Sequence, residues 1–102
     1  MSARALLFVR MDHRLAPVCV GTLPLEELPG AAFCTPATCE AAARRYFRSG
    51  PARRALVGMP WSLVLCSSAD HGRRVLAGGG QEPHPLPGYG RVLAAGGDAE
   101  IA

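Results

Sequence analysis

The sequence predicts an α+β fold of the ferredoxin-like type, with one antiparallel sheet and both helices on one face of it. Three observations predict this class: an apolar alternation near the N-terminus, one segment rich in helix-forming residues, and short apolar runs separated by glycine and proline. Together they give the order β-α-β-β-α-β. The 102 residues suffice for a single domain, residues 1–102.

The first predicted strand covers residues 5–12. Leu7 and Val9 place apolar side chains on one face, whereas Phe8 and Arg10 lie on the other, mixed face. This alternation indicates a half-buried strand, typical of a sheet that is covered by helices on one side only.

A loop is expected over residues 21–36, because two glycines and three prolines interrupt this stretch, with a short turn at residues 25–28. A helix is expected over residues 36–49. Thr35 can cap it, Pro36 suits its first position, and a Gly-Pro pair follows its end.

The second half of the chain is expected to hold two strands, a helix and a last strand. Residues 53–57 form the second strand and residues 61–66 the third, which is apolar on both faces and therefore central. A helix over residues 70–77 and a strand over residues 91–94 follow. The tail, residues 97–102, is expected to fray.

Composition limits the function classes. The net charge is +3, and all eleven cationic side chains are arginines, because the chain has no lysine. These arginines fall in separate groups along the chain. A surface that stacks nucleic-acid bases needs aromatic residues between its basic residues, and we expect none here. We therefore expect no nucleic-acid partner. No apolar run approaches about 18 residues, so we expect no membrane span and a cytoplasmic protein.

Four cysteines and three histidines are the candidate metal ligands. Cys34 and Cys39 are close in sequence, but Cys19 and Cys66 form no second pair, and the histidines are scattered. Structural zinc sites usually show two paired ligand groups. We therefore expect no metal, and reduced thiols rather than disulfides.

The stretch "ALLFVRMDHRLAP", residues 5–17, resembles the N-terminal strand of the muconolactone isomerases. Three shorter pieces follow in the family's order: "RSG" at residues 48–50, "ALVG" at residues 55–58 and "PHPLPGY" at residues 83–89. The resemblance implies a dimeric α/β-barrel, in which two ferredoxin-like sheets face each other as a homodimer or a higher homo-oligomer. The uncovered apolar face of the predicted sheet independently favours association.

The resemblance also implies an activity, a cofactor-independent proton shift within an unsaturated lactone of aromatic-compound catabolism. Such an isomerase needs a base and an acid for the moving proton. It also needs a positive or hydrogen-bonding group for the substrate carboxylate and for the developing oxyanion.

The candidate proton-transfer residues are Glu40 and His84. Glu40 lies close to the family's acidic position, and His84 lies beside the proline-rich turn near the expected pocket mouth. Each has an alternative interpretation. Glu40 can simply favour the helix dipole, and His84 can be an ordinary loop residue.

The candidate substrate-binding residues are Arg10, Phe8, Asp12 and Tyr89. Arg10 projects from the mixed face of the first strand and can bind a carboxylate through two parallel hydrogen bonds. Its alternative interpretation is an arginine at the surface or at a dimer interface.

Two further hypotheses stay open beside the isomerase. The chain can be a non-catalytic dimeric module that binds a small carboxylate or only assembles. It can also be a poorly selected reading frame of GC-rich DNA, which the absence of lysine and asparagine suggests.

Overall fold

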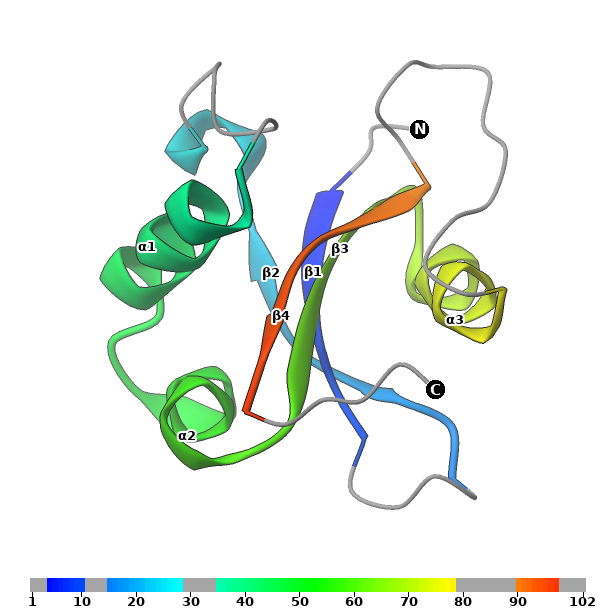
Figure 1. Ribbon diagram of the computed structural model, residues 1–102, viewed down its shortest axis with the longest axis horizontal. Helices are drawn as coiled ribbons and strands as arrows, with labels where there is room; N and C mark the ends of the chain where they lie inside the picture. The colour runs from blue at the N-terminus through cyan, green and yellow to red at the C-terminus, as the bar shows by residue number, and fades with distance from the viewer. Residues whose placement is uncertain (1–3, 11–14, 29–34, 79–89, 98–102) are drawn as a thin grey trace.

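The computed structural model describes residues 4–10, 15–28, 35–78 and 90–97. These residues form an α+β structure with a four-stranded antiparallel sheet and three α-helices (Figure 1). The elements are β1 (Arg4–Val9), β2 (Val18–Leu23), a 3-10 turn η1 (Leu25–Glu27), α1 (Pro36–Tyr46), α2 (Gly50–Gly58), β3 (Trp61–Cys66), α3 (Ala69–Ala77) and β4 (Arg91–Gly96).

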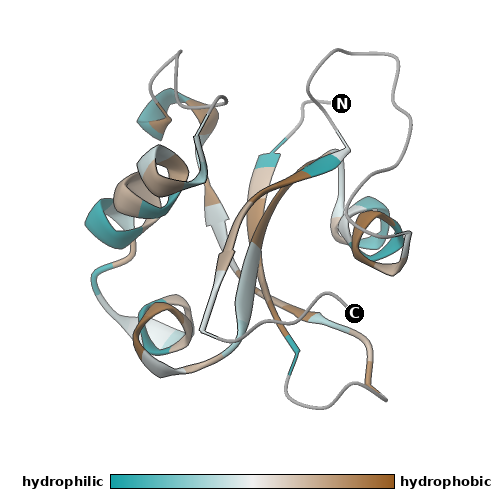
Figure 2. Ribbon diagram, viewed as in Figure 1, coloured by the Kyte–Doolittle hydropathy of each residue, from teal (hydrophilic) through white to brown (hydrophobic). Residues whose placement is uncertain are grey.

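The sheet has the strand order β2-β1-β3-β4, and every neighbouring pair is antiparallel. The strands predicted at residues 5–12 and 61–66 are found as β1 and β3, the two central strands, although β1 ends at Val9. The prediction of a half-buried first strand is wrong, because residues 5–9 are buried on both faces. All six residues of β3 are buried, as an apolar run in a central strand requires. Figure 2 shows hydrophobic residues along the strands of the sheet, in which β1 and β3 are the central pair.

Helices cover both faces of the sheet, so the prediction of helices on one face is wrong. Leu7 and Val9 of β1 lie in a core with α1 and α2, whereas Leu6 and Phe8 lie in a second core with Val75 of α3. Figure 1 shows α1 and α2 on one side of the sheet and α3 on the other. The physical reason is the apolar second face of β1 and β3, which α3 removes from water.

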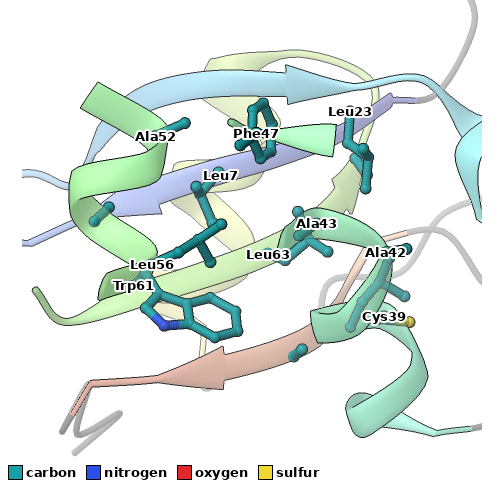
Figure 3. Close-up of a cluster of buried hydrophobic side chains, with 14 of the residues drawn as sticks. Leu7, Leu23, Cys39, Ala42, Ala43, Phe47, Ala52, Leu56, Trp61 and Leu63 are labelled. Atoms are coloured by element: carbon teal, nitrogen blue, oxygen red, sulfur yellow. The ribbon is translucent and has the colours of Figure 1, made fainter. Parts of the chain in front are cut away.

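The larger core lies between the sheet, α1 and α2 (Figure 3). Trp61 is 1% exposed and packs here. The other side chains labelled there come from both helices and three strands: Leu7, Leu23, Cys39, Ala42, Ala43, Phe47, Ala52, Leu56 and Leu63.

The predicted strand at residues 53–57 is also wrong, because this stretch belongs to α2. Ala52, Ala55 and Leu56 are buried at the i, i+3, i+4 spacing of one helix face. A short apolar run shows neither the helical nor the strand periodicity clearly. Packing against the rest of the core therefore decided that these residues are helical.

The second strand is instead β2, whose last three residues, 21–23, fall in the stretch that was expected to be a loop. β2 pairs with β1 as a hairpin, with Val9 opposite Val18 and Ala5 opposite Leu23. A strand at this edge also explains Gly21, because a methyl group there would lie 2.8 Å from the ring of Phe47. The element order is therefore β-β-α-α-β-α-β rather than β-α-β-β-α-β.

The remaining helices and strands follow the predictions within a few residues. α1 ends at Tyr46 rather than at residue 49, and its N-cap Thr35 accepts a hydrogen bond from the Thr38 backbone N–H at 3.3 Å. β4 extends the predicted strand by two residues, to Gly96. Most of the tail that was expected to fray, residues 98–102, lies outside the described residues.

Candidate functional site

The candidate site lies at the end of β1, where Arg10 follows the last residue of the strand. Because Val9 pairs with Val18, Arg10 comes next to Pro17 across the hairpin. The alternation of side chains along a strand places Arg10 on the same face as Phe8, the face that α3 covers. Arg10 is half-buried, and within the described ranges its side chain makes no hydrogen bond or ion pair.

A second arginine reaches the same end of the sheet from α3. Arg73 donates a hydrogen bond from Nε to the Pro17 carbonyl oxygen at 3.0 Å. Its Nη1 donates to Asp70 Oδ1, also at 3.0 Å. The contact with Pro17 joins residues 56 positions apart, and it ties α3 to the chain just before β2.

Arg10 and Arg73 therefore flank Pro17 on the α3 side of the sheet. An arginine has five N–H donors, so Arg73 keeps donors beyond the two that bind Pro17 and Asp70. Two guanidinium groups around one backbone segment suit a carboxylate, which accepts paired hydrogen bonds from such groups. Sequence reasoning missed Arg73, because no local signal relates it to Pro17.

The structure does not bring Glu40 to this site. Glu40 lies on α1, which packs on the opposite face of the sheet from α3. Its carboxylate accepts hydrogen bonds from Arg44, with Nη2 and Oε2 2.9 Å apart. This i, i+4 pair stabilises α1 modestly, since both side chains are more than a third exposed.

Phe8 is 1% exposed and lies in the core beneath α3. A methyl group at Gly72 of α3 would come within 2.6 Å of its ring, so helix and ring are in close contact. The other three predicted site residues, Asp12, His84 and Tyr89, lie outside the described residues.

His71 is a buried titratable side chain close to a serine hydroxyl, an arrangement found at nucleophilic sites. Its Nδ1 accepts a hydrogen bond from the Ser67 backbone N–H at 3.0 Å and lies 3.1 Å from Ser67 Oγ. The backbone of His71 in turn donates to Ser68 Oγ at 3.1 Å. These contacts satisfy backbone N–H groups at the start of α3, so the group acts as a helix cap.

Among the described residues, Cys19, Cys39 and Cys66 form no disulfide. Two of these thiols, Cys39 and Cys66, are buried and therefore poorly suited to nucleophilic chemistry. Burial, with a smaller contribution from the nearby Cys19, raises the pKa of Cys66 from 9.0 to about 11. Burial also raises the pKa of Cys39, against the smaller opposing effect of Arg91. Both groups are therefore neutral thiols near pH 7.

Within the described part of the chain, no cluster of three or more histidine, cysteine or acidic residues is arranged to hold a metal ion. In the same part of the chain, no helix has the length and apolar character needed to cross a membrane. Comparison with protein-family models, with curated proteins and with solved structures finds no match to this chain.

Proposed function

We propose that the protein binds a small carboxylate at the end of β1, with Arg10 as its anchor. One observation carries this proposal: Arg10 is a half-buried residue whose guanidinium makes no hydrogen bond or ion pair in the described structure. A charged group that is partly removed from water loses hydration free energy, and a partner of opposite charge restores favourable interactions. A ligand carboxylate supplies that partner.

Arg73 is the second binding residue in this proposal. Its hydrogen bond to the Pro17 carbonyl oxygen holds it beside the chain segment that Arg10 also borders. A carboxylate between the two arginines would accept donors from both. Arg73 would then also link occupancy of the site to the position of α3.

Ligand-induced stabilisation tests the binding function. A series of small mono- and dicarboxylates, including the open-chain acid of an unsaturated lactone, is added to the full chain, and the melting temperature is recorded. A ligand that binds only the folded state raises this temperature as its concentration increases. We expect Arg10→Ala to abolish the shift and Arg73→Ala to reduce it.

Arg4→Ala is the matched control, because Arg4 is an exposed arginine at the opposite end of β1. It removes the same charge and should leave the ligand-induced shift unchanged. If a carboxylate stabilises wild type and Arg10→Ala equally, the site is elsewhere and the proposal is wrong.

A lactone isomerase is the second candidate, supported by the resemblance of residues 5–17 to the muconolactone isomerases. In that function Arg10 would hold the substrate carboxylate, Glu40 and His84 would move the proton, and the chain would act without a cofactor as a homo-oligomeric ferredoxin-like barrel in the cytoplasm. The ion pair of Glu40 with Arg44, across the sheet from α3, favours the binding function over this one.

Turnover separates the two candidates. Muconolactone is added to the protein, and its ultraviolet absorbance is followed with wild type, Glu40→Gln and Arg10→Ala. Turnover that Glu40→Gln abolishes would establish the isomerase. Binding of the lactone without turnover would support the carboxylate-binding function alone.

A further inference from the structure

The charge of this protein is concentrated on α1, α2 and the turn between them. Residues 36–58 hold five arginines and one glutamate, a net charge of +4. The rest of the chain holds six arginines and seven carboxylates, a net charge of −1. The net positive charge of the protein therefore comes from residues 36–58. We define the arginine surface by its five members, Arg44, Arg45, Arg48, Arg53 and Arg54.

Folding brings these arginines together across the α1–α2 turn. Arg53 of α2 donates a hydrogen bond from Nη1 to the Arg44 carbonyl oxygen at 3.2 Å, and Arg48 donates from Nε to the Arg45 carbonyl oxygen at 3.1 Å. Both bonds satisfy carbonyl groups in the last turn of α1. The start of α2 is thereby held beside the end of α1.

Two members of the arginine surface are free for a ligand. Arg45 and Arg54 are exposed, and in the described structure their side chains make no hydrogen bond or ion pair. Arg44 is the only member paired with a carboxylate, that of Glu40. Figure 2 shows the end of α1 as a hydrophilic segment on the side turned away from the sheet.

An exposed aromatic residue, Tyr46, directly follows Arg45 in the chain. Tyr46 is 42% exposed at the last position of α1, whereas Phe47 beside it is 8% exposed and belongs to the core. The two rings are in edge contact, with centroids 5.1 Å apart and planes at 83°. The contact with Phe47 orients the Tyr46 ring. Because Tyr46 is exposed next to Arg45, the expectation that no aromatic residue is interleaved with the arginines is wrong.

We propose that the arginine surface and Tyr46 bind single-stranded nucleic acid. Arginine forks match the geometry of phosphate oxygens, and a tyrosine face stacks with any base. The combination of a basic surface with an exposed ring is typical of sequence-tolerant binding to single strands. This proposal is independent of the Arg10 site, which lies on the other face of the sheet.

A single strand fits this surface better than a membrane. Val57 is 71% exposed on α2, but within the described residues no other large apolar side chain of α1 or α2 reaches that exposure. A membrane-binding helix needs a broad apolar face beside its basic one. An isolated valine does not provide it.

Fluorescence anisotropy tests the proposal with the full chain and a labelled oligothymidylate, at low and at physiological salt. We expect Arg45→Ala combined with Arg54→Ala to weaken binding by about ten-fold or more. We also expect it to reduce the slope of log K against log salt by roughly 1.4, since each phosphate contact on a single strand contributes about 0.7. Tyr46→Ala should weaken binding at least about five-fold, whereas Tyr46→Phe should retain it.

Arg4→Ala is the matched control, because it removes one exposed arginine from β1 outside the arginine surface. It should leave the affinity within about two-fold and the salt slope nearly unchanged. Circular dichroism melts of every variant distinguish lost binding from lost folding. Equal effects of Arg4→Ala and of the Arg45 and Arg54 substitutions would overturn the proposal.

Two competing ligands complete the test. Vesicles of equal parts phosphatidylcholine and phosphatidylserine stand for an anionic membrane, and polyglutamate stands for an acidic protein. Stronger binding to either than to the oligothymidylate would overturn the proposal. A weak response to both, with binding that depends on Tyr46, would support it.

Discussion

At the scale of single residues, the contact between Gly72 and Phe8 sets how closely α3 approaches the sheet. A methyl group at Gly72 would lie 2.6 Å from ring carbons of Phe8 and 3.1 Å from Cys66 Sγ. Glycine lowers intrinsic helix stability, so its place in the middle of α3 has a packing reason. Without a side chain at this position, the ring of Phe8 can fill the space beneath the helix.

Gly72→Ala should therefore destabilise the protein. Overpacking of a buried contact costs about 1–3 kcal/mol, and the better helix propensity of alanine offsets about 1 kcal/mol of it. We expect a net loss of up to about 2 kcal/mol in the free energy of unfolding, measured by urea denaturation. Gly58→Ala is the control, because nothing lies within 4 Å of a methyl group there. It should be neutral or slightly stabilising, and an equal loss in both variants would contradict the packing argument.

The buried Cys66 thiol should make stability depend on pH in the alkaline range. Its pKa is about 11 in the folded protein against an ordinary value of 9.0. Below pH 9 both states keep the proton, so no stability is lost. Between about pH 9 and 11 the unfolded chain releases it first, and the free energy of unfolding should fall by roughly 2–3 kcal/mol.

Urea denaturation at pH 8 and at about pH 10.5 measures this loss. Cys66→Ala provides the comparison, since it removes the titrating group and should flatten the alkaline decrease. An alkaline decrease of the same size in both proteins would assign it to other groups.

At the scale of elements, α3 combines a cap with a close approach to the sheet. Its N-cap Ser68 accepts a hydrogen bond from the His71 backbone N–H at 3.1 Å, and the His71 ring accepts one from Ser67. The helix predicted over residues 70–77 is confirmed as α3, which begins one residue earlier, at Ala69. α2 has no comparable signal, because its N-cap Ser49 makes no side-chain hydrogen bond.

The two N-caps give a matched pair of substitutions. Ser68→Ala removes a capping bond and should lower the free energy of unfolding by about 0.5–2 kcal/mol. Ser49→Ala removes a hydroxyl that makes no capping bond, so its effect should be smaller. Thermal unfolding of both variants measures the difference, and equal effects would show that the Ser68 bond contributes nothing.

At the scale of the whole molecule, one chain covers both faces of its sheet. α1 and α2 bury the face of Leu7 and Leu63, and α3 buries the face of Phe8 and Val64. The predicted dimer rested partly on an uncovered apolar face, and α3 now occupies that face. The apolar surface that favoured association is therefore largely buried within the chain itself.

We accordingly expect the isolated chain to unfold cooperatively, with a melting temperature that does not depend on protein concentration. Obligate dimers show a melting temperature that rises with concentration, because association stabilises them by mass action. Calorimetry over a wide concentration range measures this. A clear concentration dependence would instead support the barrel dimer, and the absence of a cooperative transition would support the hypothesis of a poorly selected reading frame.

Local signals in the sequence determined the central strands β1 and β3, the capped helices α1 and α3, and the uneven distribution of charge. Period, capping residues and composition are properties of neighbouring residues, so they can be read before folding. Only the tertiary structure decided that residues 53–57 are helical, that β2 pairs with β1, and that Arg73 meets Pro17. These outcomes depend on contacts between distant segments, and burial against a partner overrides weak local preference.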